Sequence, residues 1–258
     1  EQWKGALDFA REIGAKIMVS VANSKGVHKD GKGEWMPDQA KILWDYTASQ
    51  GMKIDYAEFM NEPNMACGCM LPDNYSAEYF GRDHDLFAAW LKENHPETIL
   101  VGPCCCDTPK ATVAGGIANL MIRTDDIMKN LSIMPDIFSY HSYTCISERG
   151  QMFGFHYPAS MNLSEEYLGA TMGDLEYFKP VRDQYMPGSP MWITESADAA
   201  CGGNTWAPTF VEAIRYVDEL ARFSLHTDGV VFHNTFASGA YGWLDSRSYL
   251  PRPQYWAA

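Results

Sequence analysis

The sequence predicts an α/β fold, a (β/α)8 TIM barrel that here lacks its first two strands. Short apolar runs of strand length alternate with longer helical patterns, as expected for parallel strands joined by helices. Polar functional groups stand at the ends of four of the six predicted strands, as is usual in such barrels. The 258 residues, 46% of them hydrophobic, suffice for one large core. We therefore assign residues 1–258 to one domain.

Each predicted helix or strand follows from the spacing of its apolar residues. In the first helix, for example, Leu7, Ala10 and Ile13 share one face, and Gly14 ends the segment. A closed barrel needs eight strand–helix units, so the six strands found here match its third to eighth strands. Strands are predicted over residues 16–22, 56–62, 99–102, 135–143, 191–195 and 229–235, and helices over 3–13, 38–50, 77–94, 111–130, 167–185 and 209–227.

The charge balance limits the classes of partner. The chain has 20 basic and 33 acidic residues, a net charge of −13. This argues against nucleic-acid binding, which needs a basic surface, and a polyanionic ligand would need a local basic cleft. No segment is long and apolar enough to span a membrane. The chain opens inside a predicted helix without an initiator Met or signal peptide, so we expect a piece of a longer protein.

The seven cysteines do not predict a zinc site. None of them forms the paired C-x-x-C spacing that zinc-binding segments use. The run of three at residues 104–106 follows a predicted strand, and we interpret these as small buried or rim thiols. The number is odd and the spacing does not define a disulfide pairing. The cysteines are Cys67, Cys69, Cys104, Cys105, Cys106, Cys145 and Cys201.

Two glutamates each close a short apolar run. Residues 56–62 end at Glu62, which Pro63 follows, and residues 191–195 end at Glu195. The carboxyl ends of barrel strands meet at one face, so both side chains are expected there. A pair of carboxylates in such a position is what a retaining glycosidase needs, one as acid and one as nucleophile.

Two histidines also stand near strand ends, His141 and His233. They could be metal ligands together with one of the glutamates, but carboxylates used for glycosyl transfer need no metal. We therefore predict no metal and no cofactor. The usual role of such a histidine in a barrel is to orient a neighbouring side chain.

The ordered set of motifs resembles the clan A glycoside hydrolases, and more narrowly glycoside hydrolase family 79, the heparanase and β-glucuronidase family. The most specific motif is Asn61-Glu62-Pro63-Asn64, with a second strand-end glutamate three strands later. The matching segments run in order along nearly the whole chain. They are residues 45–46, 49–51, 61–64, 100–103, 141–143, 192–196, 201–203, 236–241, 244–245 and 253–256.

The resemblance implies a role for each catalytic residue. Glu62 would be the general acid/base, and Glu195 the nucleophile that forms a covalent glycosyl-enzyme. Asn61 would hydrogen-bond the sugar 2-hydroxyl, and the Tyr143 hydroxyl would hold Glu195 in its ionised form. The resemblance thus implies a retaining glycoside hydrolase that cleaves β-linked glucuronides, with a carbohydrate substrate as its partner.

The resemblance also implies the contacts that recognise a uronic acid. The segment 239–241 matches a stretch that holds the sugar carboxylate through backbone amides and a tyrosine hydroxyl. Residues 199–203 match a glycine-rich turn after the nucleophile, but the stretch is one residue longer than usual and lacks its tyrosine. The implied substrate-binding residues are Asn61, His141, Tyr143, Gly202, Gly203, Gly239, Ala240 and Tyr241.

Two other functions stay open at this point. One is a clan A retaining hydrolase for neutral sugars, of the β-xylosidase or β-glucosidase type. The other is a glycan-binding barrel without catalysis. The family's first two strands and its C-terminal β-sandwich are absent, so we do not expect this chain alone to be active. A secreted, periplasmic or lysosomal location is expected from the substrate class alone.

Overall fold

The computed structural model describes residues 1–68, 70–108, 121–152, 154–227 and 229–258, without the side chains of residues 67 and 68. The chain forms two compact units. The first unit consists of Glu1–Cys105 and Ile122–Phe138, and the second of Cys106–Met121 and Ser139–Ala258. The assignment of residues 1–258 to a single domain stays a prediction.

The first unit has three parallel strands in chain order, β1 (Met18–Val21), β2 (Tyr56–Phe59) and β3 (Ile99–Cys105). In the register of the sheet, Met18 lies opposite Tyr56, and Tyr56 lies opposite Ile99. The α-helices of this unit are α1 (Gln2–Ile13), α2 (Asp38–Ser49), α3 (Ala77–Asn94) and α5 (Thr124–Lys129). Its short 3-10 helices are Lys25–Val27, Lys29–Gly31 and Pro63–Gly68.

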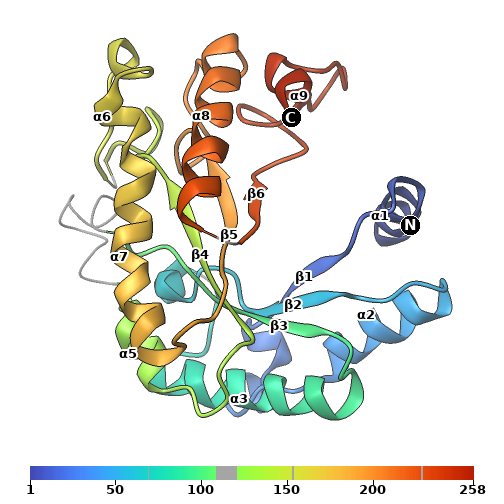
Figure 1. Cartoon of the computed structure of the whole chain (residues 1–258). Coiled ribbons are helices and arrows are strands. Elements are labelled where there is room, and N and C mark those ends of the chain that lie inside the picture. The colour runs from blue at the N-terminus through green and yellow to red at the C-terminus, as the bar shows by residue number, and fades with distance from the viewer. Residues whose placement is uncertain (69, 109–120, 153, 228) are drawn as a thin grey trace. The chain divides into compact units, whose positions relative to one another are not determined.

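Helix α3 packs against strand β2 (Figure 1). The Ser76 side chain accepts a hydrogen bond from the Tyr79 amide and caps the helix N-terminus. Phe80 and Phe87 of α3 are fully buried, and their rings lie 5.7 and 5.5 Å from that of Phe59. Burial of this aromatic cluster fixes the end of β2, where Asn61 and Glu62 follow.

The second unit carries strands β4 (Ile137–Tyr143), β5 (Met191–Ala197) and β6 (Val231–His233) in that order. Strand β4 begins in the first unit and enters the second at Ser139. Strands β5 and β6 are parallel, with a register shift between Ile193 and Ser196. The other elements are the 3-10 helix Ala159–Met161, α6 (Glu165–Leu168), α7 (Ala170–Tyr185), α8 (Phe210–His226), α9 (Pro253–Ala257) and the two-stranded sheet β7 (Ala237–Ser238) and β8 (Leu244–Asp245).

Helices α7 and α8 cover one face of β4 and β5 (Figure 1). The Ser142 hydroxyl of β4 donates to Asp174 of α7 at 2.9 Å, and the Ser196 hydroxyl of β5 donates to Glu219 of α8 at 2.7 Å. Successive strand residues point to opposite faces. Because Ser196 faces α8, the preceding residue, Glu195, faces away from the helices.

The predicted fold class is confirmed, because strands and helices alternate along the chain as in an incomplete (β/α)8 barrel. The helix predicted over 77–94 is present with the same bounds. The strand predicted over 99–102 is longer and ends at Cys105. Part of the helix predicted over 111–130 lies outside the described residues, and within 121–130 only Thr124–Lys129 is α-helical.

The strand predicted over 56–62 ends earlier, at Phe59. Met60 and Glu62 have φ angles of 62° and 46°, in the left-handed region that a strand does not use. The prediction that this strand continues to Glu62 is therefore wrong. Glu62 belongs to a turn that follows the strand, and the turn sets the direction of its side chain.

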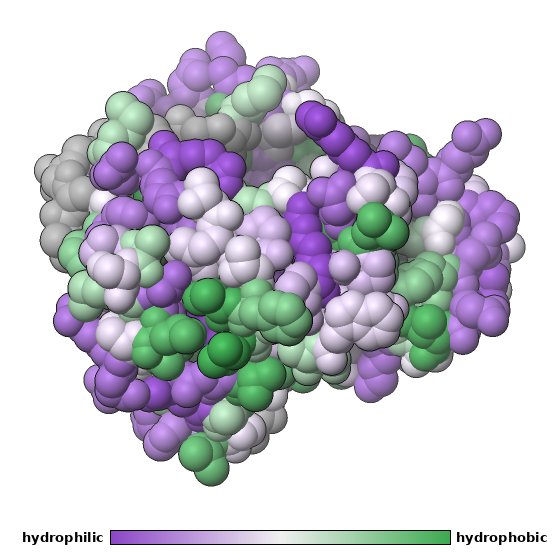
Figure 2. All heavy atoms as spheres, turned by 90° about the horizontal axis from the view of Figure 1, so that it is seen from above, coloured by the Kyte–Doolittle hydropathy of each residue, from purple (hydrophilic) through white to green (hydrophobic). Residues whose placement is uncertain are grey.

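Charged and apolar side chains share the surface of the described part of the chain. Figure 2 shows hydrophilic and hydrophobic residues next to one another on one face. In the described ranges no helix is long and apolar enough to cross a membrane. Cys104 and Cys105 are buried and Cys106 is partly exposed, which confirms small buried or rim thiols for this run of three. Cys145 is buried, whereas Cys201 is exposed.

Candidate active site

The Glu195 carboxylate is the centre of a polar cluster in the second unit. Strand β5 carries Glu195, whose side chain is 25% exposed. The Tyr143 hydroxyl, at the end of β4, donates a hydrogen bond to Glu195 Oε1. The Asn234 amide, just after β6, donates to the same oxygen at 2.7 Å. Two donors from neighbouring strands therefore hold the carboxylate in one orientation and stabilise its charge.

Tyr143 keeps its proton in this position. Burial, and then the negative charge of Glu195, raise the pKa of Tyr143 well above its ordinary value. The Asn234 amide also donates to the Tyr143 hydroxyl at 2.9 Å. The tyrosine is thus a permanent donor to Glu195, with the geometry of its hydroxyl set by the asparagine.

His141 lies on the other side of the same carboxylate. Its Nδ1 is 3.5 Å from Glu195 Oε2, and its side chain is almost completely buried. His141 and Tyr143 are alternate residues of β4 and so share a face of the strand, and both reach Glu195. The structure places His141 beside the nucleophile candidate, and the orienting role predicted for such a histidine stays a prediction.

Tyr241 connects this cluster to two glycine-containing segments, residues 202–203 and residues 239–242. Asn234 Nδ2 lies 3.4 Å from the Tyr241 hydroxyl. Burial, and then the Glu195 charge, raise the pKa of Tyr241. A Cβ on Gly203 would lie 2.6 Å from the Tyr241 ring, and Gly203 has a φ of +73°. The close approach and the left-handed backbone both require glycine at this position.

We expect Gly203→Ala to destabilise the protein more than Gly188→Ala. Both glycines have positive φ, so alanine costs about 1–2 kcal/mol of backbone strain at each. At Gly188 the new methyl group meets nothing within 4 Å, whereas at Gly203 it meets the Tyr241 ring. The clash adds about 1–3 kcal/mol. Denaturant unfolding of both variants measures the difference, and equal losses would contradict the clash.

The Asn61–Glu62 turn of the first unit has its own supports. The Cys104 thiol donates a hydrogen bond to the Met60 carbonyl at 3.0 Å, and its sulfur accepts a hydrogen bond from the backbone amide of Glu62. Burial raises the pKa of Cys104 well above its ordinary value, so the group stays a thiol and can donate. After the turn, buried Asn64 donates to the Ile122 carbonyl at 2.6 Å. Both contacts fix the backbone around Glu62.

The two side chains of this turn differ in exposure. Asn61 is exposed and Glu62 is partly buried. The Glu62 carbonyl accepts the Met65 amide at 2.9 Å, which closes the turn into the 3-10 helix Pro63–Gly68. The roles predicted for Asn61 and Glu62 stay predictions, as does the absence of a metal and a cofactor.

A buried ionic cluster lies behind strand β5. The Arg215 guanidinium forms two hydrogen bonds of 2.7 Å with Glu212 and lies 3.0 Å from Glu219. Glu219 in turn accepts the Ser196 hydroxyl. Asp198, at the loop that follows β5, is buried and accepts the Asn204 amide at 2.8 Å. The cluster attaches the segment that carries Glu195 to helix α8.

We expect Asp198→Asn to change the pH dependence of stability. Burial raises the pKa of Asp198 from 3.8 to about 6, so between these values the folded state binds a proton that the unfolded state releases. The free energy of unfolding of the native protein therefore falls as pH rises from about 4 to 6. Asparagine does not titrate, so the variant gains about 3 kcal/mol relative to the native protein over this range.

Denaturant unfolding at pH 4 and pH 7 measures this change for both proteins. Between pH 4 and pH 7, the free energy of unfolding of the variant should rise relative to that of the native protein. This holds whatever the difference between the two proteins at pH 4. Two parallel pH profiles would contradict a raised pKa for Asp198.

The structure brings most of the predicted site residues of the second unit together. Tyr143, His141 and Glu195 are in contact, and Tyr241 joins them through Asn234. Gly202 and Gly203 lie next to Tyr241, since Gly202 contributes a backbone hydrogen bond to its hydroxyl. The prediction omitted Asn234 from the site, although its position directly after a strand was a signal for it.

The fold is that of glycoside hydrolases with solved structures. A β-xylosidase from Caulobacter crescentus CB15 has a TM-score of 0.60 at 14% identity, and the match covers 98% of this chain and 62% of that one. A 4-O-α-L-rhamnosyl-β-D-glucuronidase from Fusarium oxysporum 12S has a TM-score of 0.62 at 12% identity, covering 98% of this chain and 50% of that one. At these identities the likeness concerns the fold.

Sequence similarity points to heparanase-like proteins. Heparanase-like protein 1 of Arabidopsis thaliana is 24% identical over 265 residues, covering 100% of this chain and 46% of the relative. Heparanase-like protein 2 of the same plant is 24% identical over 272 residues, with the same coverage. The predicted resemblance is confirmed, and the chain spans about half the length of these relatives. No family model matches the chain.

Proposed function

We propose that the chain is the catalytic part of a retaining glycoside hydrolase that cleaves β-linked glucuronides. The observation that carries this proposal is the Glu195 carboxylate, fixed and stabilised by hydroxyl and amide donors from Tyr143 and Asn234. Donors that hold an ionised carboxylate at a barrel strand end suit a nucleophile. The similarity to heparanase-like proteins over the whole chain supports the substrate class.

In the first step, the Glu195 carboxylate attacks the anomeric carbon of the sugar. The bond between that carbon and the leaving oxygen breaks, and Glu62 gives its proton to the leaving oxygen. The product is an ester between Glu195 and the sugar. The hydrogen bonds from Tyr143 and Asn234 keep the attacking oxygen in place. They weaken as this oxygen loses negative charge and forms the ester.

In the second step, water hydrolyses the ester. Glu62, now ionised, takes a proton from the water, whose oxygen attacks the anomeric carbon from the face that the leaving group vacated. The carboxylate of Glu195 leaves, and the same two donors stabilise its returning charge. The sugar is released with its original β configuration.

Selectivity for a glucuronide would come from the segment 239–241. Its backbone amides and the Tyr241 hydroxyl are neutral donors, which bind a carboxylate without a basic field. This suits a chain with a net charge of −13. The solved neighbours include both a β-xylosidase and a β-D-glucuronidase, so a hydrolase of neutral sugars is the second candidate.

Three aryl β-glycosides that share a leaving group test the proposal: the glucuronide, the glucoside and the xyloside. The assay uses the purified full-length protein, because this chain alone is not expected to be active. We expect kcat/KM to be highest for the glucuronide. Preference for the glucoside or xyloside would replace the substrate class and keep the reaction. If none is turned over, a glucuronate-containing polymer distinguishes an endo-acting enzyme, which cleaves it, from a binding protein, which only retains it.

A further inference from the structure

We propose that Arg252 is a positioning residue that shapes residues 239–242 into a loop for the substrate carboxylate. This inference rests on the proposed function and adds a residue on which that function would depend. Arg252 lies outside the sequence motifs that carry the family resemblance. It lies directly before helix α9, ten or more residues beyond the loop that it holds.

The guanidinium of Arg252 collects three carbonyl groups of this loop. Nη1 donates to the carbonyls of Ala240 and Gly242, both at 2.9 Å. Nη2 donates to the carbonyl of Gly239 at 2.5 Å. A single planar fork of N–H groups can reach three acceptors at once, which a lysine ammonium on a flexible chain does not reproduce.

The fourth carbonyl of the loop is held by His233. Its Nε2 lies 2.9 Å from the Tyr241 carbonyl, and Gln254 Nε2 lies 3.3 Å from its Nδ1. Burial lowers the pKa of His233 to about 4, so the ring is neutral near pH 7. Since the Gln254 amide donates to Nδ1, the ring proton is on Nε2, which donates to Tyr241. All four successive carbonyls therefore have donors.

The direction of the carbonyls sets the direction of the amides. In a planar trans peptide, the carbonyl of one residue and the N–H of the next point in opposite directions. The carbonyls of residues 239–241 point toward Arg252 and His233. The N–H groups of the same peptide units, which belong to residues 240–242, therefore point away from Arg252 and His233. In the ranges that the structure describes, these three N–H groups donate to no other group. Successive outward amides of this kind form an anion-binding concavity.

The positive charge of Arg252 adds to this effect, and the neighbouring Asp245 reduces it. Asp245 lies 3.0 Å from Nη2 and partly neutralises the guanidinium. Hydrogen bonds from the amides of Ser248 and Arg247 hold the pKa of Asp245 well below its ordinary value, so it stays ionised. The loop thus carries a fixed guanidinium on its carbonyl side, which polarises its peptide groups so that their amides favour a carboxylate over a neutral hydroxymethyl group.

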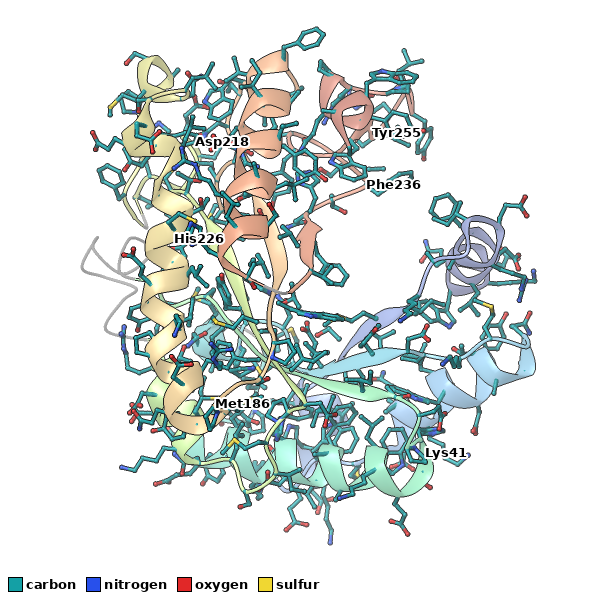
Figure 3. All side chains as sticks on the ribbon, viewed as in Figure 1. Lys41, Met186, Asp218, His226, Phe236 and Tyr255 are labelled. Atoms are coloured by element: carbon teal, nitrogen blue, oxygen red, sulfur yellow. The ribbon has the colours of Figure 1, made fainter. Side chains whose placement is uncertain are left out.

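Helix α9 determines where Arg252 stands. Gln254 of α9 is buried and its amide lies 3.3 Å from Glu212 of α8, which attaches the short helix to the second unit. Figure 3 labels Tyr255 of α9 and Phe236 ahead of β7, and these two side chains are 38% and 45% exposed. The buried Gln254 side chain, and not these exposed aromatic rings, holds α9 against α8. Its contact with Glu212 fixes Arg252 beside the loop.

Kinetics of Arg252→Met test the proposal against a matched variant, Arg247→Met. Arg247 is an exposed arginine of the neighbouring turn. For Arg252→Met we expect KM for the aryl β-glucuronide to rise at least about tenfold, with KM for the matching glucoside nearly unchanged. Arg247→Met should match the native protein for both. Equal changes in KM for both glycosides would mean a merely structural role and would overturn the proposal.

Three further measurements keep the test decisive. Arg252→Lys should fail to restore the glucuronide KM, whereas added guanidinium ion should partly restore it in Arg252→Ala. A thermal unfolding curve of each variant identifies a failure to fold. If Arg252→Met does not fold, the comparison passes to Arg252→Lys, and a native glucuronide KM in that variant would overturn the proposal.

Calorimetric binding of free glucuronate separates this inference from the proposed function. If the native protein binds glucuronate and Arg252→Met binds it at least about tenfold more weakly, the inference stands even without turnover. If both bind it equally, Arg252 does not position the loop, whatever the activity. If the native protein neither binds glucuronate nor turns over a glucuronide, the proposed function fails and the inference fails with it.

Discussion

Replacing Glu195 with glutamine is expected to reduce turnover of the aryl β-glucuronide by at least about 10⁴-fold, because an amide cannot form the glycosyl ester. Glutamine keeps the shape of the side chain and can still accept the hydrogen bonds from Tyr143 and Asn234. The fold should therefore be retained, and KM should change little. The measurement is kcat at saturating substrate, with a thermal unfolding curve for each protein.

The role of Glu195 is distinguished from that of Glu62 by azide. In Glu195→Ala, azide can occupy the space of the lost carboxylate and attack the anomeric carbon, which yields the α-glycosyl azide. In Glu62→Ala, the glycosyl ester still forms from an activated aryl glycoside, and azide attacks it to yield the β-glycosyl azide. The opposite assignment of products would exchange the two roles, and native turnover in Glu195→Gln would remove Glu195 from the mechanism.

Replacing Arg215 with methionine is expected to destabilise the protein by about 3–5 kcal/mol, since the carboxylates of Glu212 and Glu219 lose their buried counter-charge. The loss should be larger at pH 7 than at pH 5. Buried carboxylates without a partner bind protons more tightly in the folded state than in the unfolded state, so stability falls as pH rises above about 4.5. Denaturant unfolding of the native protein and the variant at pH 5 and pH 7 measures the loss of stability at each pH.

Helix α8 offers a matched control for this experiment. Arg222 forms ion pairs with Glu165 and Asp218, and Figure 3 labels Asp218 on the helix. These groups are at least partly exposed, so Arg222→Met should cost less than about 1 kcal/mol. Adding Glu212→Gln and Glu219→Gln to Arg215→Met should recover part of the lost stability. Equal losses for the two arginines would show that burial of the charges does not matter.

Helices and strands were predictable where local signals agree. In α3, a serine cap precedes apolar residues at helical spacing, and the predicted bounds 77–94 are those of the structure. Strand β5 is a short apolar run that ends close to Glu195, and this too is visible in the sequence. The turn at Met60 and Glu62 was not predictable, because its left-handed backbone depends on Cys104, 44 residues from Met60.

The sequence by itself determined the alternation of strands and helices, the fold class, and the two glutamates at the ends of apolar runs. These properties are local, since they depend on spacing along a few turns or a single strand. Only the tertiary structure decided that Asn234 contacts Glu195, that Arg215 neutralises two buried carboxylates, and that Arg252 holds residues 239–242. Such hydrogen bonds depend on where the packed strands and helices place groups that are distant or irregularly spaced along the chain, and no periodic pattern records them.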